Sequence, residues 1–141
     1  MVVVLSRTDI QKIEEFWANH KGNKRQLKIR EWELLNPSQE VDENIGGSST
    51  GYISNPTERN AIRLLEDKLY QNLKLIVRTV ETLYLELDSD TKTIVDMRYW
   101  DDENACYEWE EIADKLFISR SKVLRKRNNL IDETAQRIGW V

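Results

Sequence analysis

The chain has 141 residues, of which 40% are apolar and 33% charged, with a net charge of −4. This length allows one domain or two small ones, and the composition is typical of a soluble helical protein. Because no apolar run approaches the roughly 20 residues that cross a bilayer, the sequence predicts no membrane segment.

The low content of glycine, proline and cysteine bears on the fold class and on the cellular compartment. Five Gly and two Pro leave few breaks, so we expect long helices and an all-α fold. Cys106 is the single cysteine and has no intramolecular disulfide partner, and the N-terminus lacks the basic start and cleavage site of a signal peptide. We therefore expect a protein of the reducing cytoplasm.

The N-terminal sequence predicts two helices joined by a turn. Residues 6–20 begin with a Ser cap, and apolar side chains follow at helical spacing. Gly22 permits a turn, and residues 25–36 should form a second helix that Pro37 ends. We expect an N-terminal helical hairpin whose aromatic residues belong to a core or an interface.

Residues 37–56 are the main break in the pattern. Glycines, serines and two prolines concentrate there, which predicts a long loop. Its Gly46-Gly47-Ser48-Ser49 stretch lacks the Lys of a phosphate-binding loop, and no strand precedes it. We expect no nucleotide site in this loop.

Residues 57–87 form the longest continuous helical period of the chain. Apolar side chains recur at steps of three and four, and one helix of this length would span about 45 Å. Such a long central helix cannot be buried against one short hairpin, although a stripe of this kind is simply core in many bundles. We expect a second copy of the chain to cover it, as a homodimer.

The remaining residues, 88–141, begin with Asp88-Ser89-Asp90, after which a new helix should start. An acidic run, residues 101–104, then predicts a solvated turn rather than a cation site, because the further oxygen ligands that calcium requires do not follow. The acidic residues of the next helix, Glu108 to Asp114, are read as solvated charge, with a polymerase contact as the alternative.

Residues 109–138 have the pattern of a helix-turn-helix. Ala113 is a small residue where two helices could cross closely, Ile118 lies in the turn, and Ser119 can cap the second helix. In this motif the second helix enters a DNA major groove with its N-terminal residues at the base edges. Phe117 departs from the pattern, because it stands where the turn commonly has Gly and lacks easy access to positive φ.

The second helix of this pair is strongly basic at its start. Between residues 119 and 131 there are five Lys or Arg residues and no acid. Basic residues in a first helical turn are disfavoured by a few tenths of a kcal/mol to about 1 kcal/mol, which indicates an anionic partner. A solvated basic face on an ordinary bundle helix is the alternative. The predicted DNA-binding residues are Ser119, Arg120, Ser121, Lys122, Arg125, Lys126, Arg127 and Asn128.

These residues are expected to differ in role. Those from Arg120 to Lys122, with Arg125, should face the groove, whereas Arg127 and Asn128 should lie nearer the backbone or its flanks. Lys126 stands at a place that is usually apolar, where its methylene stem can cover the core while the ammonium reaches out.

Several short motifs resemble the RinA/ArpU-type late-gene transcriptional regulators of phages of Gram-positive bacteria. The resemblance covers about residues 6–138 and is carried by Asn44-Ile45-Gly46-Gly47, Asn55-Pro56-Thr57, Ala61-Ile62, Trp109-Glu110-Glu111-Ile112-Ala113 and Ile118-Ser119-Arg120-Ser121. It implies a C-terminal part similar to region 4 of sigma factors. It also implies a transcriptional activator of the late operon that binds double-stranded DNA near the promoter and engages host RNA polymerase in the bacterial cytoplasm.

The resulting domain expectation is a helical dimerisation region, residues 1–87, followed by a sigma region 4-like helix-turn-helix domain, residues 88–141. The alternative is a small terminase-like subunit that recognises DNA for packaging, in which the helix-turn-helix commonly comes first and the oligomerisation helices follow. Here that order is reversed.

An enzyme is the third class considered. His20 is the only histidine, and no carboxylate set accompanies a nucleophile or metal-ligand pattern. We expect no catalytic residues, no cofactor and no metal.

Overall fold

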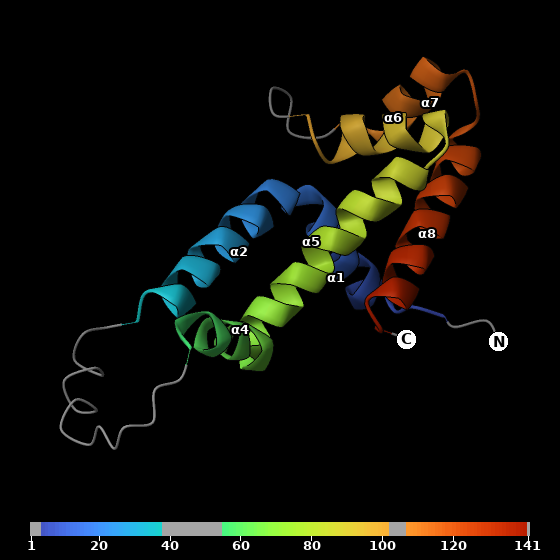
Figure 1. The fold of residues 1–141 in the computed structure, drawn as a ribbon. Helices are drawn as coiled ribbons and strands as arrows, with labels where there is room; N and C mark the ends of the chain where they lie inside the picture. Colours follow the sequence, from blue (N-terminus) through green and yellow to red (C-terminus); the bar gives the residue numbers. More distant parts are fainter. Residues whose placement is uncertain (1–3, 38–54, 102–106, 141) are drawn as a thin grey trace. The chain divides into compact units, whose positions relative to one another are not determined.

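The computed structural model describes residues 4–37, 55–101 and 107–140, and the regular structure in these ranges is helical (Figure 1). The expected all-α fold is confirmed. The helices are α1 (Arg7–Ala18), α2 (His20–Leu35), α4 (Pro56–Glu66), α5 (Lys68–Glu86), α6 (Ser89–Arg98), α7 (Trp109–Leu116) and α8 (Arg120–Arg137).

The chain divides into two compact units. The first unit comprises residues 1–23 and 75–141, and the second unit comprises residues 24–74. The domain boundary expected at residue 87 lies within the first unit. The two compact units therefore do not coincide with the two expected domains. The division into a dimerisation region and a DNA-binding domain stays a prediction.

The single long helix expected over residues 57–87 is wrong, because the helix is interrupted at Asp67. The Asp67 backbone is extended, with φ −79° and ψ 112°, and it ends α4. Its carboxylate accepts a hydrogen bond of 2.8 Å from the Tyr70 backbone N–H, as an N-cap does at the start of a helix. The Arg30 guanidinium donates two more, at 2.6 and 3.0 Å. These bonds hold the pKa of Asp67 below its usual value.

The turn expected at Gly22 is also misplaced. Asn19 alone separates α1 from α2, and Gly22 lies inside α2. A Cβ atom at Gly22 would stand 2.4 Å from the Asn19 Oδ1 atom. The glycine therefore gives room to a neighbouring side chain rather than reversing the chain. The expected helical hairpin stays a prediction.

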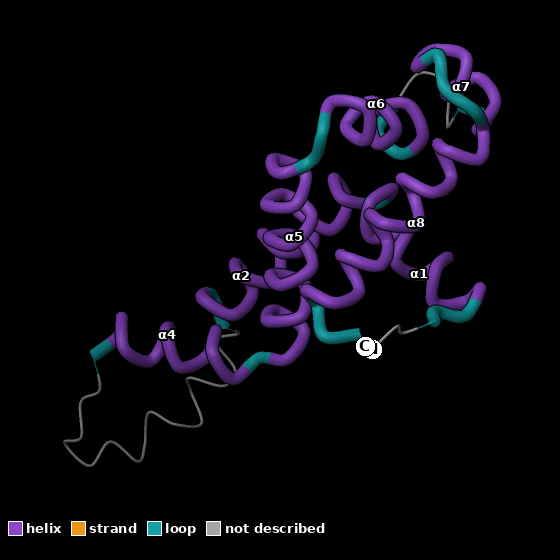
Figure 2. Tube along the Cα trace, turned by 90° about the vertical axis from the view of Figure 1, so that its right-hand side faces the viewer, coloured by secondary structure: helices purple, strands orange, loops and turns teal. Residues whose placement is uncertain are grey.

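In the first unit, α8 packs along its whole length. Its later residues join α1, α5 and Val95 of α6 in one apolar cluster, and its start joins α6 and α7 in another. Figure 2 shows the course of these helices. The first cluster is made of Ile13, Trp17, Val80, Leu83, Val95, Leu130, Ile131 and Ala135. The second is made of Ile94, Ile112, Ala113 and Val123.

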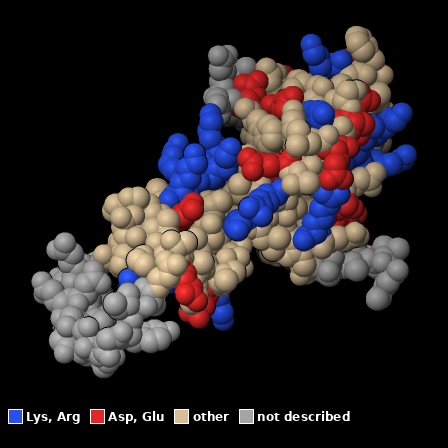
Figure 3. Space-filling view, viewed as in Figure 1, with Lys and Arg blue, Asp and Glu red and all other residues tan. Residues whose placement is uncertain are grey.

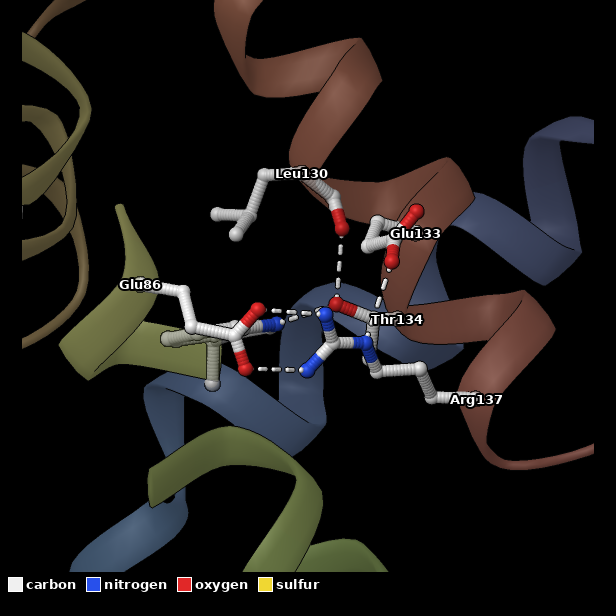
Figure 4. Close-up of polar contacts among 6 residues, drawn as sticks. Glu86, Leu130, Glu133, Thr134 and Arg137 are labelled. Carbon is white, nitrogen blue, oxygen red and sulfur yellow. Dashed lines mark hydrogen bonds and ion pairs between the residues drawn. The ribbon is translucent and has the colours of Figure 1, made fainter. Parts of the chain in front are cut away.

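Polar contacts fix the later part of α8 within the first cluster. The fully buried Trp17 donates its Nε1–H to Thr134 Oγ1 at 3.0 Å, and this hydroxyl donates to the Leu130 carbonyl at 2.7 Å. Arg137 forms a fork onto the Glu86 carboxylate at 2.8 and 2.9 Å and reaches Glu133 at 3.0 Å (Figure 4). The buried Trp17 Nε1–H and Thr134 hydroxyl therefore both have partners, as burial requires, whereas the contacts of Arg137 lie at the surface.

The described part of the second unit has hardly any apolar core. Tyr70 is its single buried apolar side chain. Helix α4 has a pronounced apolar side, yet none of its residues is buried. Large apolar side chains of this unit remain exposed instead: Ile29, Trp32, Ile62, Leu65 and Leu69.

Some expectations concern residues outside the described ranges. These include the Gly46–Ser49 stretch, Cys106 and all of the acidic run except Asp101. Among the described residues, no group of three or more His, Cys, Asp or Glu side chains is placed to hold a metal ion. None of the described helices has the length and apolar character needed to span a bilayer.

Candidate nucleic-acid interface

Helices α6, α7 and α8 pack against one another around the second apolar cluster. Ala113 is 5% exposed there, so the small residue does lie at a close helix contact. Half-buried neighbours enclose the cluster: Met97, Tyr107, Trp109, Leu116 and Ile118. Three helices that share one core are the frame on which a helix-turn-helix presents its second helix.

The turn between α7 and α8 is closed by a left-handed residue. Phe117 has φ 58° and ψ 38°. Its N–H donates to the Asp114 carbonyl at 3.3 Å, and the Ile118 N–H donates to the Ala113 carbonyl at 3.1 Å. This is the pattern of a Schellman helix end, where glycine is usual. Phe117 thus adopts positive φ without being glycine, at a cost of about 1–2 kcal/mol.

Ser119 caps α8 as the sequence predicts. Its backbone is extended, and its side-chain oxygen accepts a hydrogen bond of 3.1 Å from the Lys122 N–H. The helix therefore begins at Arg120, with basic side chains in its first turn. The first-turn N–H groups and the positive end of the helix dipole therefore lie beside Arg120 and Lys122.

Three cations at the start of α8, Arg120, Lys122 and Arg125, form what we call the α8 basic face; Lys122 and Arg125 share one side of the helix, and Arg120 is its first residue. Each is exposed, and none has a side-chain hydrogen bond or ion pair with the described residues. Figure 3 shows Lys and Arg side chains projecting at the right-hand edge of the view, where α8 begins. Three of the other predicted residues, Ser119, Ser121 and Asn128, are exposed as well.

Lys126 and Arg127 are held by carboxylates of the chain itself. The Lys126 Nζ atom lies 3.3 Å from Asp88 Oδ2, and Arg127 Nη1 lies 3.2 Å from Glu14 Oε2. Arg127 follows the buried Val123 by four residues and so lies on the inner side of α8. The structure does not bring this pair together with the α8 basic face, and DNA contacts by either residue stay a prediction.

Asn129 is an exposed residue that the sequence reasoning missed. It lies four residues after Arg125 and therefore continues the same side of the helix. An asparagine amide can form two hydrogen bonds with an adenine edge. The helical period from Arg125 was the signal that could have found it.

A polar and aromatic cluster joins α1 to α6, α7 and α8. Tyr99 donates its hydroxyl to Glu14 Oε2 at 2.5 Å, and burial, together with the Glu14 charge, raises the pKa of Tyr99 far above its usual value. The guanidinium groups of Arg98 and Arg127 lie 4.3 and 5.2 Å from the centre of the Trp109 ring. Glu14 thereby links α1 to α6 and α8, which fixes the orientation of α8 in the first unit.

Comparison with known proteins identifies a protein family. Neither a curated protein nor a solved structure matches the chain. A family model described as a protein of unknown function (DUF722) matches residues 11–136, which include α8 almost to its end. The chain therefore belongs to the DUF722 family.

Proposed function

We propose that this protein binds a specific sequence of duplex DNA through α7 and α8. The observation that carries the proposal is the α8 basic face. Its three cations stand exposed at the start of α8, the second of two helices joined by a tight turn, without a carboxylate partner among the described residues. Cations without internal partners beside a helix N-terminus suit phosphate groups and the acceptor atoms of guanine.

Base recognition in this proposal belongs to the start of α8. Arg120 and Arg125 can each reach a guanine, and Ser121 can contact either kind of base pair. Lys122 serves as a phosphate or guanine contact, and Asn128 lies toward the flank. The acidic start of α7 stays away from phosphate, and one of its acids, Glu111, already accepts a hydrogen bond of 3.2 Å from the Glu108 N–H.

The proposal extends to activation of phage late genes together with host RNA polymerase, in the cytoplasm of the bacterial host. This extension rests on the resemblance to RinA/ArpU-type regulators and to region 4 of sigma factors. Footprinting on the late promoter region of the corresponding phage tests it. Protection of a defined site and increased transcription by host polymerase are expected. A protein that protects no site in that region contradicts the proposal.

A homodimer completes the proposal, because one helix-turn-helix reads one half-site and two copies read a repeat. The second unit supplies the surface. Trp32 of α2 and Leu65 of α4 are 64% and 72% exposed. Helix α4 gathers its apolar residues on one side, yet none of these residues is buried. Helix α4 also carries both signs of charge, with Glu58 and Glu66 near its ends and Arg63 between them. A symmetric contact with a second copy would cover the apolar residues and pair opposite charges.

Mass measurement in solution tests the dimer. The unmodified chain should have the mass of two copies at micromolar concentration, and Leu65→Asp should shift it to one copy. Leu85→Asp is the matched control, because Leu85 is 76% exposed but belongs to the first unit. A ring of eight or more copies would favour the DNA-packaging alternative instead.

A further inference from the structure

Phe117 is the most exposed large apolar side chain of the described residues, at 94%. It is also the one non-glycine residue among them with positive φ. Glycine or asparagine would suit this helix end better on conformational grounds, and a polar residue would suit its exposure better. The chain therefore places a strained aromatic residue in water, and no packing within the described residues compensates for it.

The position of Phe117 indicates which contact could offset the cost of its strain and exposure. It lies two residues before the Ser119 cap and three before Arg120, in the turn that leads into the α8 basic face. A duplex that docks against Arg120 and Lys122 must come close to this turn. DNA offers apolar surface there, in thymine methyl groups at the edge of the major groove and in the deoxyribose rings beside it.

We propose that Phe117 makes an apolar contact with duplex DNA beside the α8 basic face, against a thymine methyl group or a deoxyribose ring. This inference rests on the proposed function. The contact would place an aromatic ring next to the charged groups that hold the phosphates. It would remove Phe117 from water only in the complex, so it strengthens binding without stabilising the free protein.

The variant Phe117→Gly tests the contact without endangering the fold. Glycine takes the left-handed conformation at no steric cost, so the melting temperature of the free protein should stay level or rise. The affinity for the footprinted duplex should nevertheless fall about fivefold or more, because the apolar contact is lost. Phe117→Asn, which also tolerates this conformation, should lose affinity in the same way. Leu85→Ala is the control and should bind like the unmodified chain.

Replacing single thymines of the site by uracil distinguishes the two apolar surfaces. If Phe117 contacts a methyl group, one replacement weakens the unmodified chain and leaves Phe117→Gly unaffected. If it contacts deoxyribose, no replacement has that effect, while the loss caused by Phe117→Gly remains. Each pattern supports the contact and assigns it.

Equal DNA affinity of the unmodified chain and Phe117→Gly would overturn this inference alone. Reduced transcription by polymerase alongside that equal affinity would assign the ring to a protein partner. Failure of the unmodified chain to bind any duplex is a different result, since it would remove the proposed function itself.

Discussion

The cations at the start of α8, residues 120–125, differ from those in its remainder, residues 126–137, in whether they pair with carboxylates of the chain. Arg120, Lys122 and Arg125 have no carboxylate partner among the described residues, although the whole chain is acidic. Every cation of the remainder has one: Lys126 with Asp88, Arg127 with Glu14, and Arg137 with Glu86 and Glu133.

The difference separates two uses of positive charge in one helix. The cations of the remainder link α8 to α1, to α5 and to the start of α6, next to the larger apolar cluster. The cations of the start have no ion pair that joins them to another described helix, and two of them, Arg120 and Lys122, lie in the first turn, where the helix dipole opposes them. A charge that is costly for the free protein and has no carboxylate partner in the described part of the chain fits a role in binding an anionic partner.

The largest expected effect comes from removing the anchor of the remainder. Trp17→Ala deletes a fully buried side chain and its hydrogen bond to Thr134, so the free energy of unfolding should fall by about 3–5 kcal/mol. Urea denaturation measures this. Trp140→Ala is the control, because Trp140 is 39% exposed and should cost much less. Similar losses for the two variants would contradict the central place of Trp17 in the core.

Replacing one arginine in each part of α8 tests the contrast between the two parts. Arg125→Ala should weaken binding to the cognate duplex by about 1–3 kcal/mol and leave unfolding unchanged. Arg137→Ala should do the reverse, lowering the melting temperature while the folded protein binds as before. Anisotropy titration and thermal denaturation of both variants provide the comparison.

Two outcomes of that experiment carry different messages. Equal loss by Arg125→Ala on cognate and random DNA would make Arg125 a phosphate contact rather than a base contact. Loss of affinity in both variants, or in neither, would break the distinction between the start of α8 and its remainder.

A buried hydrogen bond gives the next effect. Thr134→Val keeps the shape of the side chain but leaves the Trp17 Nε1–H without an acceptor, which should cost about 1–3 kcal/mol of unfolding free energy. Thr134→Ser retains the hydroxyl and should recover part of the loss. A valine variant as stable as the parent would show that this hydrogen bond has no net effect.

The smallest effect is a pH dependence. Hydrogen bonds from Arg137 lower the pKa of Glu86 below its usual 4.5. The stabilisation is therefore complete above that value and is lost as the pH falls through the lower pKa of the folded state. Glu86→Gln should be less stable than the unmodified chain at pH 7, and the difference should shrink in acid. A difference that does not depend on pH would contradict the ion pair.

The sequence predicted the elements whose signals are local. Ser119 had both the side chain and the position of a cap, and the small Ala113 marked the contact of two helices. Asp67 was misread because the apolar period continues across it, and an aspartate inside such a period can either stay exposed on a helix or cap a new one. The bond from Arg30, which is distant in sequence, was not visible in that pattern.

The sequence predicted the exposed cations of the α8 basic face, but it did not predict the internal ion pairs of Lys126 and Arg127. Exposure of the α8 basic face followed from the charge pattern at the start of the helix. The pairing of Lys126 with Asp88 and of Arg127 with Glu14 depends on how α6 and α1 pack against α8. The helical period did place Arg127 on the side of Val123, but the run of adjacent cations obscured it.

The salt dependence of duplex binding tests the central claim most directly. The triple variant Arg120→Ala, Lys122→Ala, Arg125→Ala would be compared with the unmodified chain and with a control triple that removes the exposed Arg7, Lys28 and Arg78. Each lost phosphate contact reduces the slope of log affinity against log salt by about 0.9. We predict tight binding at low salt by the parent and the control, and a weaker, flatter dependence for the α8 variant. A parent that ignores duplex DNA at low salt, or two triple variants that bind alike, would contradict the account.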